Sequence, residues 1–288
     1  MRLRSHIKTA AIICLLAFMT VSATAAPKAV LWERWQANDP FSKISVDHGQ
    51  WSRFLGIYLT PGRPGDVSTV AYSRVSASDK QRVGDYIVSL EGVRVGSLNR
   101  SEQFAYWVNL YNAGTVRLIL DRYPVKSIRD IKLGGLFSSG PWDAKLFIVE
   151  GEALSLNDIE HRILRPIWKD PRIHYAVNCA SFSCPNLQGT AFTAENSSRL
   201  LDQAARSYIN SARGVDFSSG TLVLSSIYSW YAEDFGSGQA ELLDHLRRYA
   251  DPALAERLAG YRGKISFGYD WSLNERSLNE RSLNESRP

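Results

Sequence analysis

The sequence predicts an α+β protein, a single mixed domain in which several helices pack around a small central sheet. Three observations lead to this class. Long segments place apolar residues at helical spacing, most clearly residues 101–123. Shorter segments rich in β-branched and aromatic residues, such as 145–156 and 173–179, indicate strands. The two kinds do not alternate as in βαβ units, and we find no linker long enough to separate two domains.

Residues 1–25 have the pattern of a secretory signal peptide. Basic residues occupy the start, residues 9–21 form an apolar run, and residues 23–25 supply the small residues of a cleavage site. The run is shorter than the about 20 apolar residues of a spanning helix. We therefore expect an exported protein, periplasmic or secreted, whose mature chain begins near Ala26 with a lead-in at 26–45.

The charge balance gives no indication of a nucleic-acid partner. The chain has 34 Lys and Arg residues against 29 Asp and Glu, and removal of residues 1–25 leaves 31 basic residues, a net charge of +2. No run of five or more like charges follows, whereas nucleic-acid binding needs a basic stripe. No later stretch is apolar enough for a membrane span.

The first half of the mature chain is predicted to be mostly helical. Helices are expected at 46–59 and 77–90, and a Pro/Gly stretch at 61–66 ends the first of them. In the helix at 101–123, the apolar stripe consists of Phe104, Trp107, Val108, Tyr111, Thr115, Leu118 and Ile119.

A hairpin and a short helix are predicted next. Residues 145–156 are expected to turn at Glu150-Gly151. Ser155 and Asp158 match a variant of the capping box that opens a helix over 158–165, and Pro166 is expected to stop that helix.

The remaining elements include the strand that we expect at the centre of the sheet. They are a central strand at 173–179, a helix at 194–211, a hairpin turning at 218–220, helices at 225–235, 239–249 and 252–261, and a last strand at 264–271. Residues 272–286 then repeat SLNER, SLNER, SLNES. A period of five puts the leucines on no single face of a helix or strand, so we expect 275–288 to be a disordered tail.

Cys179 and Cys184, in the stretch HYAVNCASFSCPNL, are the cysteines of the mature chain, since Cys14 would leave with the leader. An oxidising compartment permits a disulfide between them, although so small a ring stabilises by only about 2 kcal/mol. A zinc site would have to add His161 and His174, at spacings looser than structural zinc shows. We expect no metal and no cofactor.

Cys179 also lies where the expected strand ends and a polar loop begins, a rigid support for a reactive side chain. In such a strand His174 would lie about 17 Å away and on the opposite face. We therefore expect His161 as the base, with Glu160 or an asparagine orienting it and Cys179 as the nucleophile. This arrangement predicts a cysteine-dependent hydrolase or acyl transferase with chemistry like that of papain or transglutaminase.

Polar residues within apolar helices suggest the rest of a site. Asn109 and Asn112 lie three apart in an apolar helix, where each must either orient a site or bond nearby backbone. Asp234 lies in a similar cluster and has Arg165 as an alternative partner. The residues expected to bind a ligand beside Cys179 are Asn109, Tyr111, Asn112, His174, Asn178, Ser181, Trp230 and Asp234.

Five segments taken together resemble a known family. They are FAYWVNLYNAGT (104–115), LSLNDIEHRILR (154–165), HYAVNCASFSCP (174–185), YSWYAEDF (228–235) and YDWSLN (269–274). Over roughly 46–274 the chain resembles the family catalogued as domain of unknown function 547, as an exported bacterial member. Plant members are similar around Cys179 but commonly lack the second cysteine. The resemblance therefore implies that Cys179 is the essential thiol and Cys184 an accessory one, and it implies no particular reaction.

A second function class stays open from the sequence. In it the protein is a non-catalytic envelope domain, with Cys179 and Cys184 bonded and an aromatic cleft holding a small molecule, a peptide or a glycan. A thiol oxidoreductase is disfavoured, because the two cysteines lack the Cys-x-x-Cys spacing.

Overall fold

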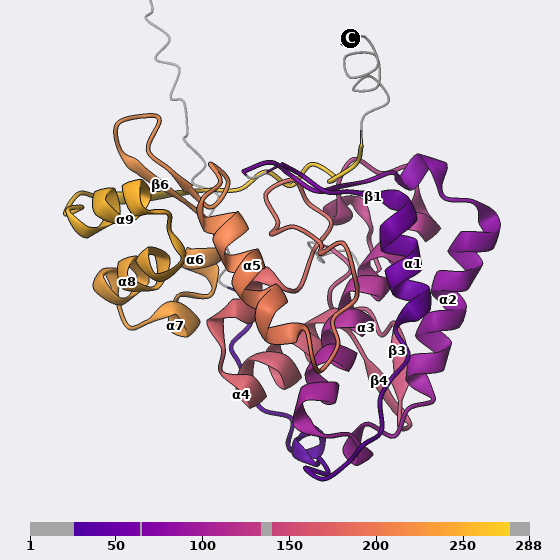
Figure 1. Ribbon diagram of the computed structural model, residues 1–288. Coiled ribbons are helices and arrows are strands. Elements are labelled where there is room, and N and C mark those ends of the chain that lie inside the picture. Colours follow the sequence, from indigo (N-terminus) through magenta and orange to yellow (C-terminus); the bar gives the residue numbers. More distant parts are fainter. Residues whose placement is uncertain (1–25, 64, 134–139, 277–288) are drawn as a thin grey trace, which may run out of the picture.

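The computed structural model describes residues 26–63, 65–133 and 140–276 (Figure 1). It confirms the α+β class, since helices dominate and the strands form small sheets of two, two and three strands. The expected leader and the repeat beyond residue 276 lie outside the described residues. Within the described ranges, no helix has both the length and the apolar character needed to cross a membrane.

Three helices form the N-terminal half: α1 (Gly49–Tyr58), α2 (Ala77–Glu91) and α3 (Arg100–Arg122). Between the first two, β1 (Leu59–Thr60) pairs antiparallel with β2 (Thr69–Val70). The α3 helix is buried on nearly all sides, not only along its predicted stripe. It begins where Asn99 accepts hydrogen bonds from the backbone N–H groups of Ser101 and Glu102. A helix therefore occupies the centre of the molecule, where we expected a sheet.

Short 3-10 helices connect these elements. They lie at Glu33–Gln36, Tyr72–Arg74, Val95–Ser97, Ile128–Asp130 and Pro171–Tyr175.

The predicted hairpin is confirmed as β3 (Phe147–Val149) and β4 (Glu152–Leu154). Glu150 and Gly151 both have positive φ, 49° and 81°, as a tight two-residue turn requires. The hairpin packs closely on α3, because a Cβ at Gly114 would collide with the ring of Phe147.

The capping box after the hairpin is also confirmed. The Ser155 N–H donates to Asp158 Oδ2 (2.9 Å), and the Asp158 N–H donates to Ser155 Oγ (3.1 Å). The helix that follows is a π-helix (Asp158–Leu164) that continues into α4 (Arg165–Trp168). The predicted stop at Pro166 is wrong, because this proline lies in the first turn of α4, where a missing N–H is tolerated.

The predicted central strand at 173–179 is also wrong. Its first half is the 3-10 helix at Pro171–Tyr175, opened by Asp170, whose side chain accepts the Arg172 N–H. The rest is irregular backbone whose polar groups bond side chains of other elements. The β-branched and aromatic residues of this stretch reflect its burial, which strands and buried loops share.

The C-terminal half begins with α5 (Ser197–Ile209) and a three-stranded sheet. Strand β6 (Leu222–Ser225) pairs antiparallel with β5 (Val215–Asp216) and parallel with β7 (Ile265–Gly268). The predicted helix at 225–235 is split at Tyr231 into two. Four helices lie between β6 and β7: α6 (Ile227–Trp230), α7 (Ala232–Phe235), α8 (Gln239–Tyr249) and α9 (Pro252–Ala259).

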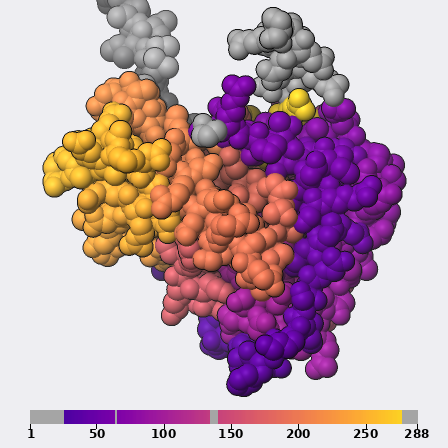
Figure 2. All heavy atoms as spheres, viewed as in Figure 1, coloured from indigo at the N-terminus to yellow at the C-terminus, as the bar shows by residue number. Residues whose placement is uncertain are grey.

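The buried apolar side chains form two clusters. One surrounds α3 and the β3–β4 hairpin, and the other lies among α5, β6 and α8. In the space-filling view the N-terminal helices (indigo to magenta) form one flank and the C-terminal helices (yellow) the other (Figure 2). The irregular backbone after Tyr175 connects the two clusters.

After β7, residues 269–276 run back across the molecule, and we call them the C-terminal segment. In Figure 1 this yellow chain passes along the top toward β1. Its backbone bonds distant parts of the chain: Phe182 N–H donates to Ser272 O (2.7 Å), Asn274 N–H donates to Ala180 O (3.0 Å), and Val70 N–H donates to Asn274 O (2.9 Å). The last described residues therefore join the N-terminal helices to the stretch that carries the cysteines.

Candidate functional site

Two asparagine side chains fix the loop that carries the cysteines, residues 176–185, here called the cysteine loop. Asn112, on α3, donates to Ala176 O (2.9 Å) and accepts the Asn178 N–H (2.8 Å). Asn178 in turn donates to Pro185 O (2.7 Å) and accepts the Ala180 N–H (2.8 Å). In a sheet, these backbone groups would bond a neighbouring strand. Here the buried amides bond them, so the irregular loop is hydrogen-bonded without a strand partner.

The cysteine loop brings two free thiols together. Cys179 is partly exposed and Cys184 is buried, and their Sγ atoms lie 3.1 Å apart, so the disulfide left open by the sequence is not formed in this structure. The Cys179 sulfur also lies 3.1 Å from Ser181 Oγ and 3.1 Å from the hydroxyl of Tyr269, the first residue of the C-terminal segment.

These contacts favour the ionised form of Cys179. The hydrogen bond with Cys184, together with the hydroxyls of Ser181 and Tyr269, outweighs burial and lowers the pKa of Cys179 to about 7. Burial raises the pKa of Cys184 well above its ordinary value. Near neutral pH the partly exposed Cys179 is thus divided between thiol and thiolate, and Cys184 stays protonated beside it.

A second group of polar side chains, the ionic cluster, consists of Glu160, His161, Arg165 and His174, which are buried, and Asp234, which is partly exposed. Asp234 Oδ2 lies 2.6 Å from His174 Nε2 and accepts from Arg165 Nε at 2.6 Å. Arg165 Nη1 lies 3.1 Å from His161 Nδ1, and His174 Nδ1 lies 3.7 Å from Glu160 Oε1. The alternative pairing of Asp234 with Arg165 is therefore confirmed.

Burial and neighbouring charges shift the pKa values within the ionic cluster. Burial lowers the pKa of His161 and so favours its neutral ring, against the opposing charge of Glu160. Burial alone would raise the pKa of Glu160, but the positive charges of His161, His174 and Arg165 lower it to about 2.

Two tyrosines, Tyr111 (buried) and Tyr231 (partly buried), lie within electrostatic range of both Glu160 and Cys179. The Tyr111 hydroxyl donates to Glu160 Oε2 (3.1 Å), and the Tyr231 ring stacks on His174 with centroids 4.1 Å apart. Burial raises the pKa of each tyrosine, and the charges of Glu160 and Cys179 add to that rise. The charges of Glu160 and Cys179 therefore act on the same two tyrosines, Tyr111 and Tyr231.

The structure shows no bond between Cys179 and the predicted base. Within the described ranges, the hydrogen bonds of the Cys179 sulfur go to Cys184, Ser181 and Tyr269, and none goes to a histidine ring. His161 faces Arg165 instead, and the Glu160 side chain binds Tyr111. The catalytic roles of Glu160 and His161 stay predictions.

Of the expected binding residues, Asn109 is placed elsewhere. Its amide donates to Phe192 O (2.8 Å) and accepts the Phe192 N–H (3.0 Å), which anchors the chain before α5. Tyr269 was not among the expected residues, although it opens the YDWSLN segment. Its position at the sulfur depends on a contact 90 residues away in the sequence, which no local pattern reveals.

Trp230 belongs to a partly exposed aromatic cluster beside the thiols. Its ring centroid lies 4.8 Å from that of Tyr269 and 5.5 Å from that of Trp271. Trp142 packs on Trp271 at 5.7 Å, and the Arg129 guanidinium lies 5.3 Å from the Trp271 ring. Aromatic faces next to a reactive sulfur are suited to hold an apolar or sugar-like ligand.

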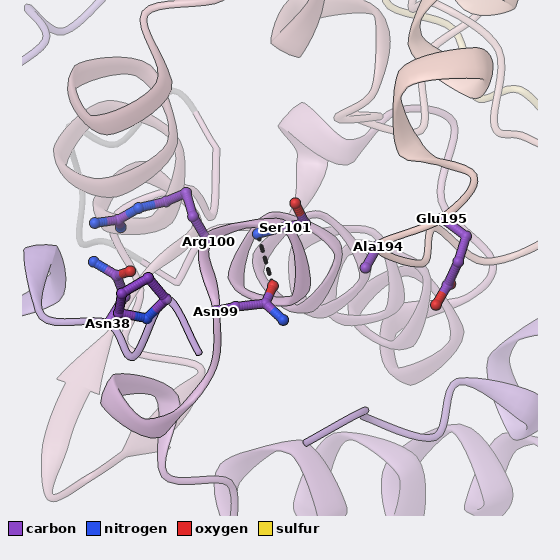
Figure 3. Close-up of a pocket in the computed structure, with 7 residues that line it drawn as sticks. Asn38, Asn99, Arg100, Ser101, Ala194 and Glu195 are labelled. Carbon is purple, nitrogen blue, oxygen red and sulfur yellow. Dashed lines mark hydrogen bonds between the residues drawn. The ribbon is translucent and has the colours of Figure 1, made fainter. Parts of the chain in front are cut away.

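A separate surface pocket of about 450 Å³ lies near the start of α3 (Figure 3). It is lined by Asn38, Pro40, Asn99, Arg100, Ser101, Ala194 and Glu195. The side-chain oxygen of Asn99 accepts the Ser101 N–H at 3.1 Å, the dashed line in Figure 3. No predicted site residue lines this pocket, so its size does not make it the site of chemistry. The described part of the chain also contains no group of three or more His, Cys, Asp or Glu side chains placed to hold a metal ion.

Comparison with known proteins agrees with the resemblance noted in the sequence. A family model described as "Protein of unknown function, DUF547" matches residues 95–209. The matched range holds α3, the π-helix and the cysteine loop, whereas Tyr231, Asp234 and Tyr269 lie beyond it. No curated protein and no solved structure matches the chain significantly. The chain is therefore similar over residues 95–209 to a family of unknown function.

Proposed function

We propose that this protein uses the Cys179 thiolate as the nucleophile of a hydrolysis or acyl-transfer reaction. One observation carries the proposal: a partly exposed sulfur has thiol and hydroxyl partners at 3.1 Å from Cys184, Ser181 and Tyr269. Such donors stabilise a thiolate, which is the reactive form of cysteine. With the pKa of Cys179 at about 7, roughly half of the protein carries the nucleophile at pH 7.

The reaction forms and breaks one bond to the sulfur. The Cys179 electron pair attacks a carbonyl carbon, and the leaving group departs with its bonding pair and takes a proton from water. Water or another acceptor then cleaves the thioester and restores the thiol. As the sulfur becomes acylated, the hydroxyls of Ser181 and Tyr269 no longer have a thiolate to donate to. They can then donate to the oxyanion that develops on the carbonyl oxygen.

This proposal differs from a papain-like pair in how the sulfur is activated. In such a pair a histidine beside the cysteine takes its proton. Here the donors around Cys179 stabilise the anion in advance, and the ionic cluster acts through Tyr111 and Tyr231. We therefore assign Glu160 and Arg165 as positioning residues, and His161 is the proposed acceptor for a later proton transfer.

Acylation by an activated ester tests the proposal. Incubation of the full chain with p-nitrophenyl acetate is expected to give a burst of p-nitrophenol and a hydroxylamine-sensitive acetyl group on the tryptic peptide Ile173–Arg199, which carries both cysteines. Cys179→Ser removes both signals, and Cys14→Ser is the matched control that keeps them. A burst of equal size in Cys179→Ser, or an unmodified peptide, would show that the proposal is wrong.

A binding role is the second candidate, and the aromatic cluster favours it. Trp230, Tyr269 and Trp271 form a partly exposed surface of contacting rings, a common recognition surface for apolar and sugar-like ligands. In this reading the protein is a non-catalytic envelope domain whose cysteines become bonded in the oxidising compartment. Ligand-induced change in tryptophan fluorescence, with no acylation of Cys179, is the result that distinguishes binding from catalysis.

We also propose that the protein works outside the cytoplasm, in the periplasm or as a secreted protein. The support is the basic, apolar and small-residue pattern of residues 1–25.

A further inference from the structure

We propose that Cys179 and Cys184 form a reactive dithiol that reduces low-molecular-weight disulfides, with Cys179 as the attacking thiol and Cys184 as the resolving thiol. This activity is separate from acyl transfer and does not rest on it. It assigns a chemical role to Cys184, which the acyl-transfer proposal uses only as a hydrogen-bond donor.

The geometry of the cysteine loop carries the proposal. The two sulfurs lie 3.1 Å apart as free thiols, and the bond length of a disulfide is about 2 Å, so an approach of about 1 Å joins them. The backbone enforces this proximity. Cys179 N–H donates to Cys184 Sγ at 3.0 Å, and Cys184 N–H donates to Ser181 O at 3.0 Å.

The sequence spacing had argued against this chemistry, and the backbone shows why that argument fails. Reactive dithiols usually lie in a Cys-x-x-Cys turn, whereas these cysteines are five residues apart. Ala180 has a φ of 57°, a left-handed conformation that turns the chain directly after Cys179. The Asn178 side chain bonds both Ala180 and Pro185 and so closes the loop. The tight turn thus brings two cysteines that are five residues apart as close together as those of a Cys-x-x-Cys turn.

The two thiols differ in the way that an attacking and a resolving thiol must differ. Cys179 is partly exposed, whereas Cys184 is only 5% exposed, so an external disulfide meets Cys179 first. The lowered pKa of Cys179 and the raised pKa of Cys184 agree with this order. The buried thiol keeps its proton until a sulfur bond forms next to it.

The reaction balances in two steps. The Cys179 thiolate attacks one sulfur of the external disulfide, and the other sulfur leaves as a thiolate with the bonding pair and takes a proton from water. Cys184 then gives its proton to water, and its sulfur attacks that of Cys179. The second external sulfur leaves with the bonding pair and takes a proton from water. The external disulfide gains two electrons, and the two protein thiols lose two.

Oxidised glutathione is the probe for the test. The reduced, desalted full chain carrying Cys14→Ser is expected to release two molecules of glutathione per protein. The peptide Ile173–Arg199 then becomes lighter by two hydrogens and keeps no glutathionyl group. A glutathionyl group that stays on either cysteine of the otherwise unmodified chain would overturn the proposal, as would a peptide that does not react.

Two matched variants identify the roles of the thiols. Cys184→Ser is expected to release one glutathione and to retain a stable adduct on Cys179, whereas Cys179→Ser should react at least about tenfold more slowly because the remaining thiol is buried. Equal rates in the two variants would contradict the assignment. If Cys184→Ser does not fold, the mass of the peptide from the chain with both cysteines still shows whether the two thiols have formed a disulfide. A failure of acylation by p-nitrophenyl acetate leaves this result unaffected, so the two proposals are tested separately.

Discussion

The Nε2 atom of His174 lies 2.6 Å from Oδ2 of Asp234, and that same oxygen accepts a hydrogen bond from Arg165 at 2.6 Å. One carboxylate on α7 thus joins Arg165, the first residue of α4, to His174 in the 3-10 helix Pro171–Tyr175. The Arg165 side chain is 2% exposed and that of Asp234 is 20% exposed, so a buried guanidinium pairs with a partly exposed carboxylate.

Removal of that carboxylate is expected to destabilise the fold. Asp234→Ala leaves the buried Arg165 guanidinium without one of its charged partners, which should lower the free energy of unfolding by about 3 kcal/mol. Urea denaturation measures the loss. Asp244→Ala is the matched control, because its ion pair with Arg247 is exposed and should contribute less than about 1 kcal/mol. Equal losses in the two variants would show that the cluster does not stabilise the fold.

Acid should weaken the fold through the same carboxylate. Burial alone would raise the pKa of Asp234, but hydrogen bonds from His174 and Arg165 lower it to about 2, below the about 4 of an unfolded chain. A lowered pKa stabilises the fold above the unfolded value, and that contribution is lost as the pH falls toward the folded value. Between about pH 6 and pH 3, Asp234 alone should account for a loss of about 1 kcal/mol.

The pH dependence has its own control. Asp234→Ala should lose less stability than the parent chain over the same interval, as measured by urea denaturation at each pH. The same pH dependence in both chains would mean that other carboxylates account for all of the acid sensitivity.

Tyr269 is expected to activate Cys179. Tyr269→Phe removes a hydroxyl 3.1 Å from the sulfur and should raise the pKa of Cys179 by about one unit, because a hydrogen bond to a charged group is lost. The pH dependence of alkylation by iodoacetamide measures this pKa. Tyr261→Phe is the matched control. The hydroxyl of Tyr261 donates to Lys264 O, which precedes β7, whereas Tyr269 follows it. An unchanged alkylation profile in Tyr269→Phe would exclude the hydroxyl as a source of activation.

Alanine variants of Asn112 and Asn109 distinguish two effects, the positioning of the cysteine loop and the general stability of the fold. Both are buried on α3, and each bonds one loop in both directions. Asn112→Ala and Asn109→Ala should each cost about 2 kcal/mol, because buried backbone groups lose their partners. Only Asn112→Ala should also change the alkylation rate of Cys179, since Asn112 holds Ala176 and Asn178. The opposite pattern would mean that Asn112 does not position the thiol.

The leader is tested by the mature N-terminus. Expression of the full chain in a bacterium, followed by fractionation and N-terminal sequencing, should find the protein outside the cytoplasm with a chain that begins near Ala26. Replacement of Ala23 and Ala25 by bulky residues should leave the leader attached, because the peptidase requires small residues there. A cytoplasmic chain that retains residues 1–25 would exclude export.

Local signals in the sequence were enough to predict most of the helices and the β3–β4 hairpin. The apolar spacing of 101–123 predicted α3 to within a residue or so at each end, and Glu150-Gly151 predicted the turn. The capping box of Ser155 and Asp158 was also predicted, because its partners lie three residues apart. In each of these cases the interactions that define the element lie within a few residues of each other.

Long-range contacts account for what the sequence did not reveal. Residues 173–179 have strand-like composition, yet they do not form a strand. The Asn178 N–H donates instead to the side chain of Asn112, which lies 66 residues earlier in the sequence. The predicted separation of His174 from Cys179 depended on that strand and has no basis without it. The attraction between Arg165 and Asp234 was foreseeable from their charges, but the hydroxyl of Tyr269 at the sulfur was not.

The C-terminal segment has a consequence for how the thiol site comes into being as the chain is made. Cys179 leaves the ribosome well before Tyr269, which is 90 residues further along, and before the backbone that pairs with Ala180 and Phe182. Until those last residues arrive, the sulfur lacks one of its hydrogen-bond donors and the loop lacks its outer support. Before residue 269 is made, Cys179 can have its contacts with Ser181 and Cys184 but not the hydrogen bond with Tyr269, so its full set of partners forms only after that residue has folded back onto the loop.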